Sequence, residues 1–265
     1  MNDPLYVRAR EVLLDALGAL GDHAGSIVLV GAQAIYLRVG AGDLPVPPYT
    51  TDGDLAVDPR GLRDEPLLAE ALRRAHLSQR AGSPGVWLAE DSVQIDLLVP
   101  EELARRPGRR GADLGPHGSK VSRQVKGLVA AVIDSTMLNI GALGEADARS
   151  FRVAVANKGG LLVAKLHKIA DRTGTDRQSD KDALDILRIL RGSGPGELAV
   201  ALRALRADPV AGPTTGEGIE LLRSLFGSPA AEGSRMAGNA AQALVPEGEL
   251  EASCAALAAE LLRDL

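Results

Sequence analysis

Two aspartates one residue apart are the feature of this chain most able to do chemistry. Asp52 and Asp54 lie in the run Thr51-Asp52-Gly53-Asp54-Leu55-Ala56-Val57. Side chains two residues apart on an extended strand point to the same face, so we expect the two carboxylates to lie together. Neighbouring carboxylates repel each other unless a cation lies between them. Because oxygen ligands suit hard divalent ions, the pair predicts a site for Mg²⁺ or Mn²⁺.

A third aspartate, Asp96, lies in the middle of the apolar run Val93-Gln94-Ile95-Asp96-Leu97-Leu98-Val99. A carboxylate in so apolar a strand is costly unless it is paired or binds a metal. If this strand lies beside the strand of Asp52 and Asp54, three carboxylates converge. The sequence then predicts a two-metal site, in which one ion activates an attacking hydroxyl and another bridges a triphosphate. Asp96 is expected to be a metal ligand there, or a general base.

A glycine-led turn precedes these acids. Gly31 and Ala32 follow an apolar run over residues 26–30 and open a predicted helix over residues 31–39. Backbone N–H groups at the start of a helix bind phosphate. A glycine turn into a helix, followed by an Asp-x-Asp strand, is a layout that holds a nucleoside triphosphate (NTP) and its metals.

A basic helix is predicted further along the chain. Lys165, Lys168 and Arg172 are spaced i, i+3 and i+7, which places them on one helix face. If this face looks onto the acids, it would hold triphosphate oxygens and stabilise the charge that develops on pyrophosphate. Asp182 and Asp185 would orient these cations or complete the site. The alternative is a solvated helix face whose charged side chains form ion pairs with one another.

Hydrophobic alternation and periodicity place strands in the front of the chain and helices behind them, which predicts an α+β fold. We expect strands near residues 26–30, 53–57, 86–89, 93–99 and 151–156, and a strand-rich segment over residues 127–140. We expect helices near residues 5–21, 31–39, 65–75, 159–173, 180–192, 195–206, 216–226, 235–244 and 248–264.

The motifs together resemble the AbiEii-type nucleotidyltransferases, the toxin halves of abortive-infection and toxin–antitoxin pairs. The resemblance covers roughly residues 25–190 and rests on Gly31-Ala32, Thr51-Asp52-Gly53-Asp54, the Lys165 to Arg172 helix and Lys181-Asp182-Ala183-Leu184-Asp185. It implies a nucleotidyltransferase-like mixed sheet with flanking helices over residues 1–157. It also implies a helical domain over residues 158–265 that completes the active-site cleft.

The resemblance implies roles for individual residues. Asp52 and Asp54 would bind metal, Lys165 would contact the nucleotide, and Asp182 or Asp185 would be needed for activity. The nucleotide site would also include Gly31, Ala32, Thr51, Lys168 and Arg172. The implied reaction is Mg²⁺-dependent transfer of a nucleoside monophosphate from an NTP to an RNA, with tRNA as the acceptor and a protein antitoxin as a possible partner. Two residues depart from the family pattern: Ala32 supplies no hydroxyl at the turn, and Gly53 removes an apolar anchor from the strand.

Composition narrows the class of protein. The chain has 265 residues, a formal charge of −5 and one cysteine. One cysteine excludes an intramolecular disulfide and suggests a reducing compartment. No apolar run approaches the roughly 20 residues that cross a bilayer, and the N-terminus does not suit a signal peptide. We therefore expect a cytoplasmic protein with no membrane partner.

Positive charge is concentrated between residues 101 and 130, a segment that contains seven basic and three acidic residues. Such a segment attracts a polyanion, so Arg105, Arg106, Arg109 and Arg110 are candidates for contact with an RNA backbone. A solvated loop is the alternative.

Two other functions stay open from the sequence. The same fold transfers nucleotides to a small cationic acceptor of the aminoglycoside type, which an acidic surface would suit. A catalytically silent nucleotidyltransferase-like binding module would also account for Ala32 and Gly53.

Overall fold

The computed structural model describes residues 3–44, 46–175, 179–194, 196–241 and 244–265. The chain divides into two compact units. The first consists of Met1–Ala34, Tyr49–Leu128 and Ser135–Ala156, and the second of Ile35–Pro48, Val129–Asp134 and Asn157–Leu265. The predicted boundary after residue 157 lies next to Asn157, where the last segment of the second unit begins. Two earlier segments, residues 35–48 and 129–134, also belong to the second unit.

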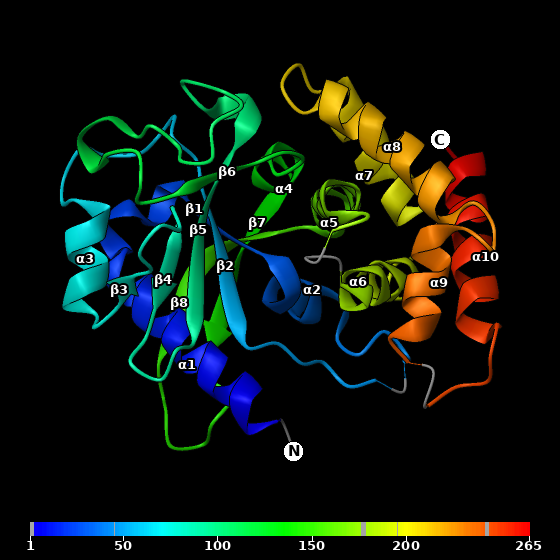
Figure 1. The fold of residues 1–265 in the computed structure, drawn as a ribbon, viewed down its shortest axis with the longest axis horizontal. Helices are drawn as coiled ribbons and strands as arrows, with labels where there is room; N and C mark the ends of the chain where they lie inside the picture. Colours follow the sequence, from blue (N-terminus) through cyan, green and yellow to red (C-terminus); the bar gives the residue numbers. More distant parts are fainter. Residues whose placement is uncertain (1–2, 45, 176–178, 195, 242–243) are drawn as a thin grey trace. The chain divides into compact units, whose positions relative to one another are not determined.

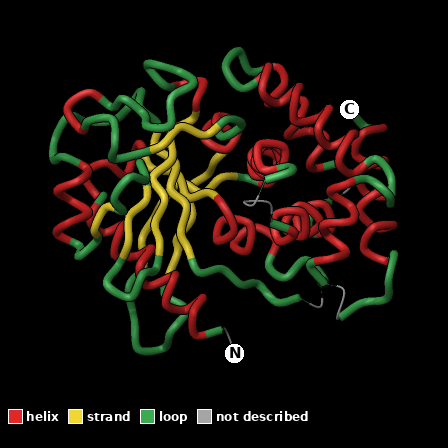
Figure 2. The backbone as a smooth tube through the Cα atoms, in the orientation of Figure 1, coloured by secondary structure: helices red, strands yellow, loops and turns green. Residues whose placement is uncertain are grey.

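The first unit is built on a mixed sheet with the strand order β3-β4-β5-β2-β1-β8-β7, and β6 pairs with β5 (Figure 1; Figure 2). The pairs β1–β8, β2–β5 and β5–β6 are parallel, and the other neighbours are antiparallel. The strands are β1 (Ile27–Val30), β2 (Asp52–Val57), β3 (Ser78–Gln79), β4 (Val86–Leu88), β5 (Gln94–Pro100), β6 (Arg123–Val125), β7 (Ser135–Gly141) and β8 (Ser150–Ala156). A mixed sheet followed by helices confirms the predicted α+β class.

Helix α1 (Pro4–Ala19) covers one face of this sheet, and α3 (Leu68–Arg74) lies beside it (Figure 1). The start of α1 is fixed by Asp3, whose Oδ1 accepts a hydrogen bond of 2.8 Å from the backbone N–H of Leu5. Such a cap, followed by Pro4 in the first turn, is a favourable helix start. The buried side of α1 is apolar and fully enclosed at Val12, Leu13 and Leu14.

Gly53 allows α1 to pack closely against β2. A Cβ atom on Gly53 would lie 2.9 Å from Cδ1 of Ile95 and 3.3 Å from Cδ1 of Leu13. The apolar contact that this glycine lacks is therefore supplied by its neighbours, and β2 continues without interruption from Asp52 to Val57.

The second unit is helical. Helix α2 (Gly31–Val39) begins in the first unit and ends in the second. The other helices of the second unit are α4 (Val129–Ile133), α5 (Lys158–Arg172), α6 (Asp180–Arg191), α7 (Glu197–Ala207), α8 (Gly212–Phe226), α9 (Glu232–Asn239) and α10 (Glu249–Arg263). Each helix predicted after residue 158 has a counterpart, but the helix predicted over residues 235–244 spans Glu232–Asn239. Residues 195 and 242–243, which fall in predicted helices, lie outside the described ranges. No helix within the described ranges is long and apolar enough to cross a membrane.

The strand-rich prediction for residues 127–140 is half wrong, because Val129–Ile133 is the helix α4 and only Ser135–Gly141 is a strand. A short apolar run does not distinguish a buried strand from a buried helix by periodicity. Helix α4 is held by close packing against α5. A Cβ atom on Gly160 would lie 2.6 Å from the carbonyl oxygen of Ala130, so only glycine permits this approach.

We expect Gly160→Ala to destabilise the protein by about 1–3 kcal/mol, because the added methyl group meets backbone that must shift. The matched control is Gly216→Ala in α8, where a Cβ atom would have nothing within 4 Å. There the better helix propensity of alanine should raise stability by up to about 1 kcal/mol. Urea unfolding followed by circular dichroism measures both, and an equal effect of the two substitutions would refute the α4–α5 packing.

Candidate functional site

The three aspartates predicted as a site lie on two neighbouring strands. In the parallel pair of β2 and β5, Asp54 is opposite Asp96 and Asp52 is opposite Gln94. Residues directly opposite each other and residues two apart share a face, so Asp52, Asp54 and Asp96 lie on one face of the sheet. Gly53 points to the other face, toward Leu13 of α1. The predicted placement of the two strands side by side is therefore confirmed.

The carboxylate of Asp54 lies directly against the glycine turn. Gly31 has φ +70°, and a Cβ atom on it would lie 2.0 Å from Oδ2 of Asp54. The pairing of Val30 with Asp54 in the β1–β2 ladder brings the two together. A side chain at residue 31 would occupy the position of the carboxylate, so the turn and the acid require each other. The start of α2 carries a partial positive charge, which favours an anion at this point.

Asp52 is half-buried, and both its side chain and its backbone carbonyl group accept hydrogen bonds. Its Oδ1 accepts a hydrogen bond of 2.5 Å from the hydroxyl of Thr50. Its carbonyl oxygen accepts one of 2.9 Å from Nε2 of Gln33, the third residue of α2. The backbone at the start of β2 is thus tied to the first turn of α2.

Asp96 is only 5% exposed and has polar partners at both carboxylate oxygens. Nη2 of Arg123 donates to Oδ2 at 2.7 Å, and Nε2 of Gln94 donates to Oδ1 at 2.8 Å. This pairing relieves the cost of burying the carboxylate. The role of Asp96 as a metal ligand or base stays a prediction, and it would require Arg123 to move.

The chemistry of the donors fits a hard divalent ion at Asp52 and Asp54. Mg²⁺ is commonly bound by one or two carboxylates, with waters and substrate phosphate oxygens as its other ligands. The residues that the structure describes contain no group of three or more His, Cys, Asp or Glu side chains placed to hold a metal by themselves. Any metal here would therefore take its further ligands from water or from a bound substrate.

Ala32 and Thr51, the other residues predicted in the nucleotide site of the first unit, differ in exposure. Ala32 is 5% exposed, with its methyl group in the core, while Thr51 is exposed at the start of β2. A hydroxyl at residue 32 would have been enclosed, so its absence removes no exposed ligand.

The second unit contains a separate cluster of buried charges around Lys165, which is 4% exposed. Its Nζ donates to Oδ1 of Asp182 at 2.6 Å and to Oδ2 of Asp185 at 2.9 Å. Burial alone would lower the pKa of Lys165, but the two carboxylates outweigh it and leave the pKa raised. Burial likewise opposes the charge of Asp182, and Lys165 and Lys168 hold its pKa well below the usual range.

More cations than anions meet in this cluster. Asp182 contacts Lys168 at 3.0 Å and Arg172 at 3.6 Å, and Asp185 contacts Lys181 at 3.6 Å and Arg188 at 3.1 Å. With Lys165, five cationic side chains of the described chain contact these two carboxylates. The predicted face of Lys165, Lys168 and Arg172 is thus an ion-pair network, but with buried acids.

Three of the cationic side chains in this cluster are partly accessible to solvent. Lys168, Arg172 and Lys181 keep 32%, 24% and 38% of their side chains exposed, whereas Lys165 is enclosed. Tyr36 of α2 lies against the cluster, and Nζ of Lys181 is 5.8 Å from the centre of the Tyr36 ring. The expectation that this cluster faces the three aspartates stays a prediction.

Arg188 was not expected at the site, although its spacing of i+3 from Asp185 was a usable signal. Its guanidinium is 1% exposed and donates to the carbonyl oxygens of Ala41 at 3.3 Å, Val46 at 2.5 Å and Pro47 at 3.3 Å. The loop between α2 and β2 is therefore fastened to α6.

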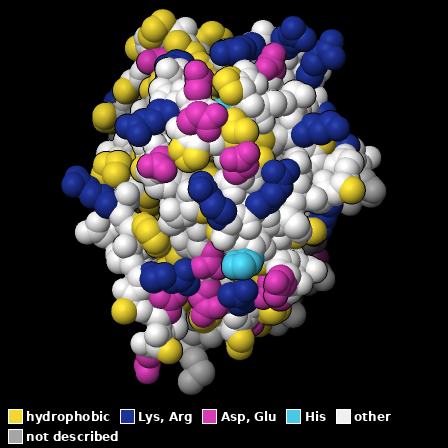
Figure 3. All heavy atoms as spheres, turned by 90° about the vertical axis from the view of Figure 1, so that its left-hand side faces the viewer, with side chains coloured by type: hydrophobic (Ala, Val, Ile, Leu, Met, Phe, Trp, Pro, Cys, Tyr) yellow, Lys and Arg dark blue, Asp and Glu magenta, His cyan; other side chains and the backbone are white. Residues whose placement is uncertain are grey.

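The basic segment is a loop beside the strand of Asp96. Strand β6 pairs with β5, and Arg123 of β6 makes the ion pair with Asp96. The exposed basic residues of the segment are Arg105, Arg106, Arg109, Arg110, Lys120 and Lys126. Basic and acidic side chains are interspersed over the face of the molecule that Figure 3 shows.

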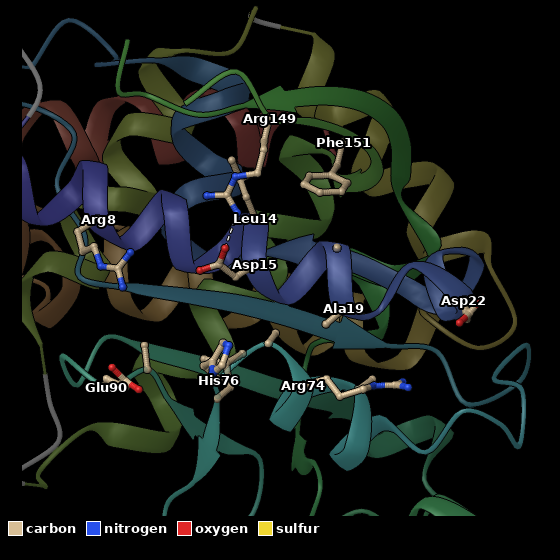
Figure 4. A pocket seen from close by; sticks show the side chains of 15 residues that line it. Arg8, Leu14, Asp15, Ala19, Asp22, Arg74, His76, Glu90, Arg149 and Phe151 are labelled. Atoms are coloured by element: carbon tan, nitrogen blue, oxygen red, sulfur yellow. Dashed lines mark hydrogen bonds and ion pairs between the residues drawn. The ribbon is translucent and has the colours of Figure 1, made fainter. Parts of the chain in front are cut away.

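A hollow of about 910 Å³ lies on the first unit, between α1, α3 and the edge of the sheet (Figure 4). The side chains of Arg149 and Asp15 form an ion pair across it, and Phe151 lies beside them. Asp52, Asp54 and Asp96 do not line it. Of its charged lining residues, Arg149 pairs with Asp15, while Arg8 pairs with Glu11 and Asp91 outside the lining.

No protein-family model and no curated protein matches the chain. Among solved structures, the chain is similar to an antigenic nucleotidyltransferase-like protein from Paracoccidioides brasiliensis, with a TM-score of 0.36 and 16% sequence identity. The match covers 83% of this chain and 94% of that chain. A similarity of this size assigns no activity to the chain.

We expect a strong coupling between Gly31 and Asp54. Gly31→Ala should destabilise the protein by about 2–4 kcal/mol, from the left-handed backbone and the contact with the carboxylate. In an Asp54→Gly background, which removes the carboxylate and also the Cβ atom of residue 54 at 2.9 Å, the same change should cost about 1–2 kcal/mol, since only the backbone strain remains. Urea unfolding of the four proteins measures the coupling, and additive effects would contradict the packing of acid on turn.

The pH dependence of stability should report the Asp182 ion pairs. The lowered pKa of Asp182 means that its contribution is complete above the unfolded value of about 4 and is lost as pH falls through the folded value. The stability difference between the protein and Asp182→Asn should therefore stay constant down to about pH 4 and shrink progressively below it. For the control Glu220→Gln, which breaks an exposed pair with Arg223, the difference should stay small at every pH.

Proposed function

We propose that the protein is a metal-dependent nucleotidyltransferase that moves a nucleoside monophosphate from an NTP to a hydroxyl of an RNA. The observation that carries the proposal is the contact of Asp54 with the Gly31 turn, with Asp52 and Asp96 on the same face. This unites a helix start that binds phosphate with carboxylates that bind a hard cation.

The residues of the first unit would hold the reacting groups. Asp52 and Asp54 would bind the metal, and the N–H groups at Gly31 and Ala32 would bind phosphate oxygens. When bound, Mg²⁺ neutralises phosphate charge and activates the attacking hydroxyl. Asp96 would join as a third ligand, or accept the proton of the hydroxyl, once Arg123 releases it.

The reaction forms one bond and breaks one. The acceptor oxygen attacks the α-phosphorus of the NTP, its proton passes to a carboxylate, and the bond to pyrophosphate breaks. The accessible cations Lys168 and Arg172 would stabilise the charge on the leaving pyrophosphate. Lys165 and Asp182 would act from within the cluster, by holding those cations in place.

The acceptor and partners follow from charge and from the resemblance to AbiEii-type toxins. The exposed arginines of the loop that precedes β6 suit an RNA backbone, and the resemblance implies tRNA as the RNA and a protein antitoxin as a partner. Since NTPs and tRNA are cytoplasmic, the proposal places the protein there.

A small cationic acceptor of the aminoglycoside type is favoured by one observation. A hollow of about 710 Å³ in the second unit is lined by the acids Asp180, Glu232, Glu247 and Glu251. Its other lining residues include Arg235, so the negative charge is partly offset.

The decisive experiment is incorporation of α-labelled NTPs with Mg²⁺ into total RNA or an aminoglycoside. Asp54→Asn should reduce incorporation at least about 100-fold, because a neutral amide binds the cation poorly. Asp58→Asn, at the exit of β2 and paired with Arg60, is the control and should retain activity. If folded Asp54→Asn still incorporates the label, the proposed mechanism is wrong. If the label appears in the aminoglycoside and not in RNA, the acceptor is the small molecule.

A further inference from the structure

A buried polar chain leads from α1 to the strand of the aspartates. Nε of Arg10 donates to Oε1 of Gln33 at 2.7 Å, and Nε2 of Gln33 donates to the carbonyl oxygen of Asp52 at 2.9 Å. Arg10 and Gln33 are 2% and 1% exposed. All of these residues belong to the first unit.

The chain is unusual because its cation has only neutral partners. In the described part of the chain Arg10 makes no ion pair with a carboxylate; it donates to Gln33, to the carbonyl oxygen of Gly141 at 3.0 Å and to the hydroxyl of Tyr6 at 3.4 Å. Burial lowers the pKa of Arg10. A guanidinium without a carboxylate is a costly element of a core, which points to a role in orienting its neighbours.

Arg10 determines how the amide of Gln33 is turned. A guanidinium only donates hydrogen bonds, so it must face the amide oxygen of Gln33. The amide nitrogen must then face β2, where the carbonyl oxygen of Asp52 is its acceptor. Gln33 therefore fixes the distance between the first turn of α2 and the backbone of Asp52.

We propose that Gln33, oriented by Arg10, is a positioning residue that holds Asp52 at the start of β2, on the face of the sheet that carries Asp54. Its effect on catalysis rests on the proposed function, whereas its effect on the backbone of β2 does not. The side chain of Gln33 itself touches neither substrate nor metal.

Gln33→Glu separates the two halves of this arrangement. The carboxylate still accepts from Arg10 and now pairs with it, so the core keeps its shape. It offers no N–H to Asp52 and places an oxygen against the carbonyl oxygen. The matched control is Gln79→Glu on β3, because Nε2 of Gln79 also donates to a backbone carbonyl, that of Lys120, at the exposed edge of the sheet.

Hydrogen exchange measured by mass spectrometry tests the backbone role. In Gln33→Glu, exchange in peptides covering residues 50–56 should increase about tenfold, with other strands unchanged and the thermal midpoint retained. Gln79→Glu should leave these peptides unchanged. If Gln33→Glu does not fold, Gln33→Met removes the same donor without adding charge. Unchanged exchange at residues 50–56 in the folded variant would overturn the proposal.

Calorimetry with Mg²⁺ and each NTP tests the consequence at the site. Affinity for the NTP in the presence of Mg²⁺ should fall about tenfold in Gln33→Glu and stay constant in Gln79→Glu. Unchanged affinity beside faster exchange would overturn the role in positioning Asp52. A parent protein that binds no NTP would remove the proposed function, while the exchange result would still decide whether Gln33 holds β2.

Discussion

The first unit depends on one steric constraint, the placement of a carboxylate where a side chain at residue 31 would be. Gly31 adopts φ +70° and leaves the space that Asp54 fills. The direction of α2, the register of β1 with β2 and the location of the acids are therefore linked, because none of them changes without the others. Charge acts in the same sense, since the start of a helix attracts an anion. A single glycine thus determines both the shape and the electrostatics of this end of the sheet.

Buried charged side chains have different numbers of charged partners in the two units. Around Lys165 the second unit surrounds two carboxylates with five cations of the described chain, so each acid has several partners, and Lys168, Arg172 and Lys181 stay partly exposed. In the first unit Asp96 has one cationic partner, Arg123, and Arg10 has none that is charged in the described part of the chain. Removing one partner of a buried pair costs about 3–5 kcal/mol, so both arrangements tolerate few substitutions.

Much of this arrangement was predictable from sequence, for physical reasons. Alternation along a strand placed Asp52 and Asp54 on one face, and the apolar run around Asp96 indicated the neighbouring strand. Helical spacing grouped Lys165, Lys168 and Arg172, and the same rule applied to Asp185 would have added Lys181 and Arg188. Nothing in the sequence links Arg10 to Gln33, because that contact depends on how α1 and α2 pack. Residues 129–133 were misassigned because a short apolar run suits a buried strand and a buried helix equally.

The hydrogen bonds from Arg188 to Ala41, Val46 and Pro47 change what this connection tolerates. Surface loops usually vary in length and accept insertions, because little of their backbone is engaged. Here three carbonyl oxygens are acceptors for a fully enclosed guanidinium. Lengthening or nicking the loop would leave that cation short of acceptors inside the helical unit. The connection that follows α2 therefore has less freedom to change than its exposed residues suggest.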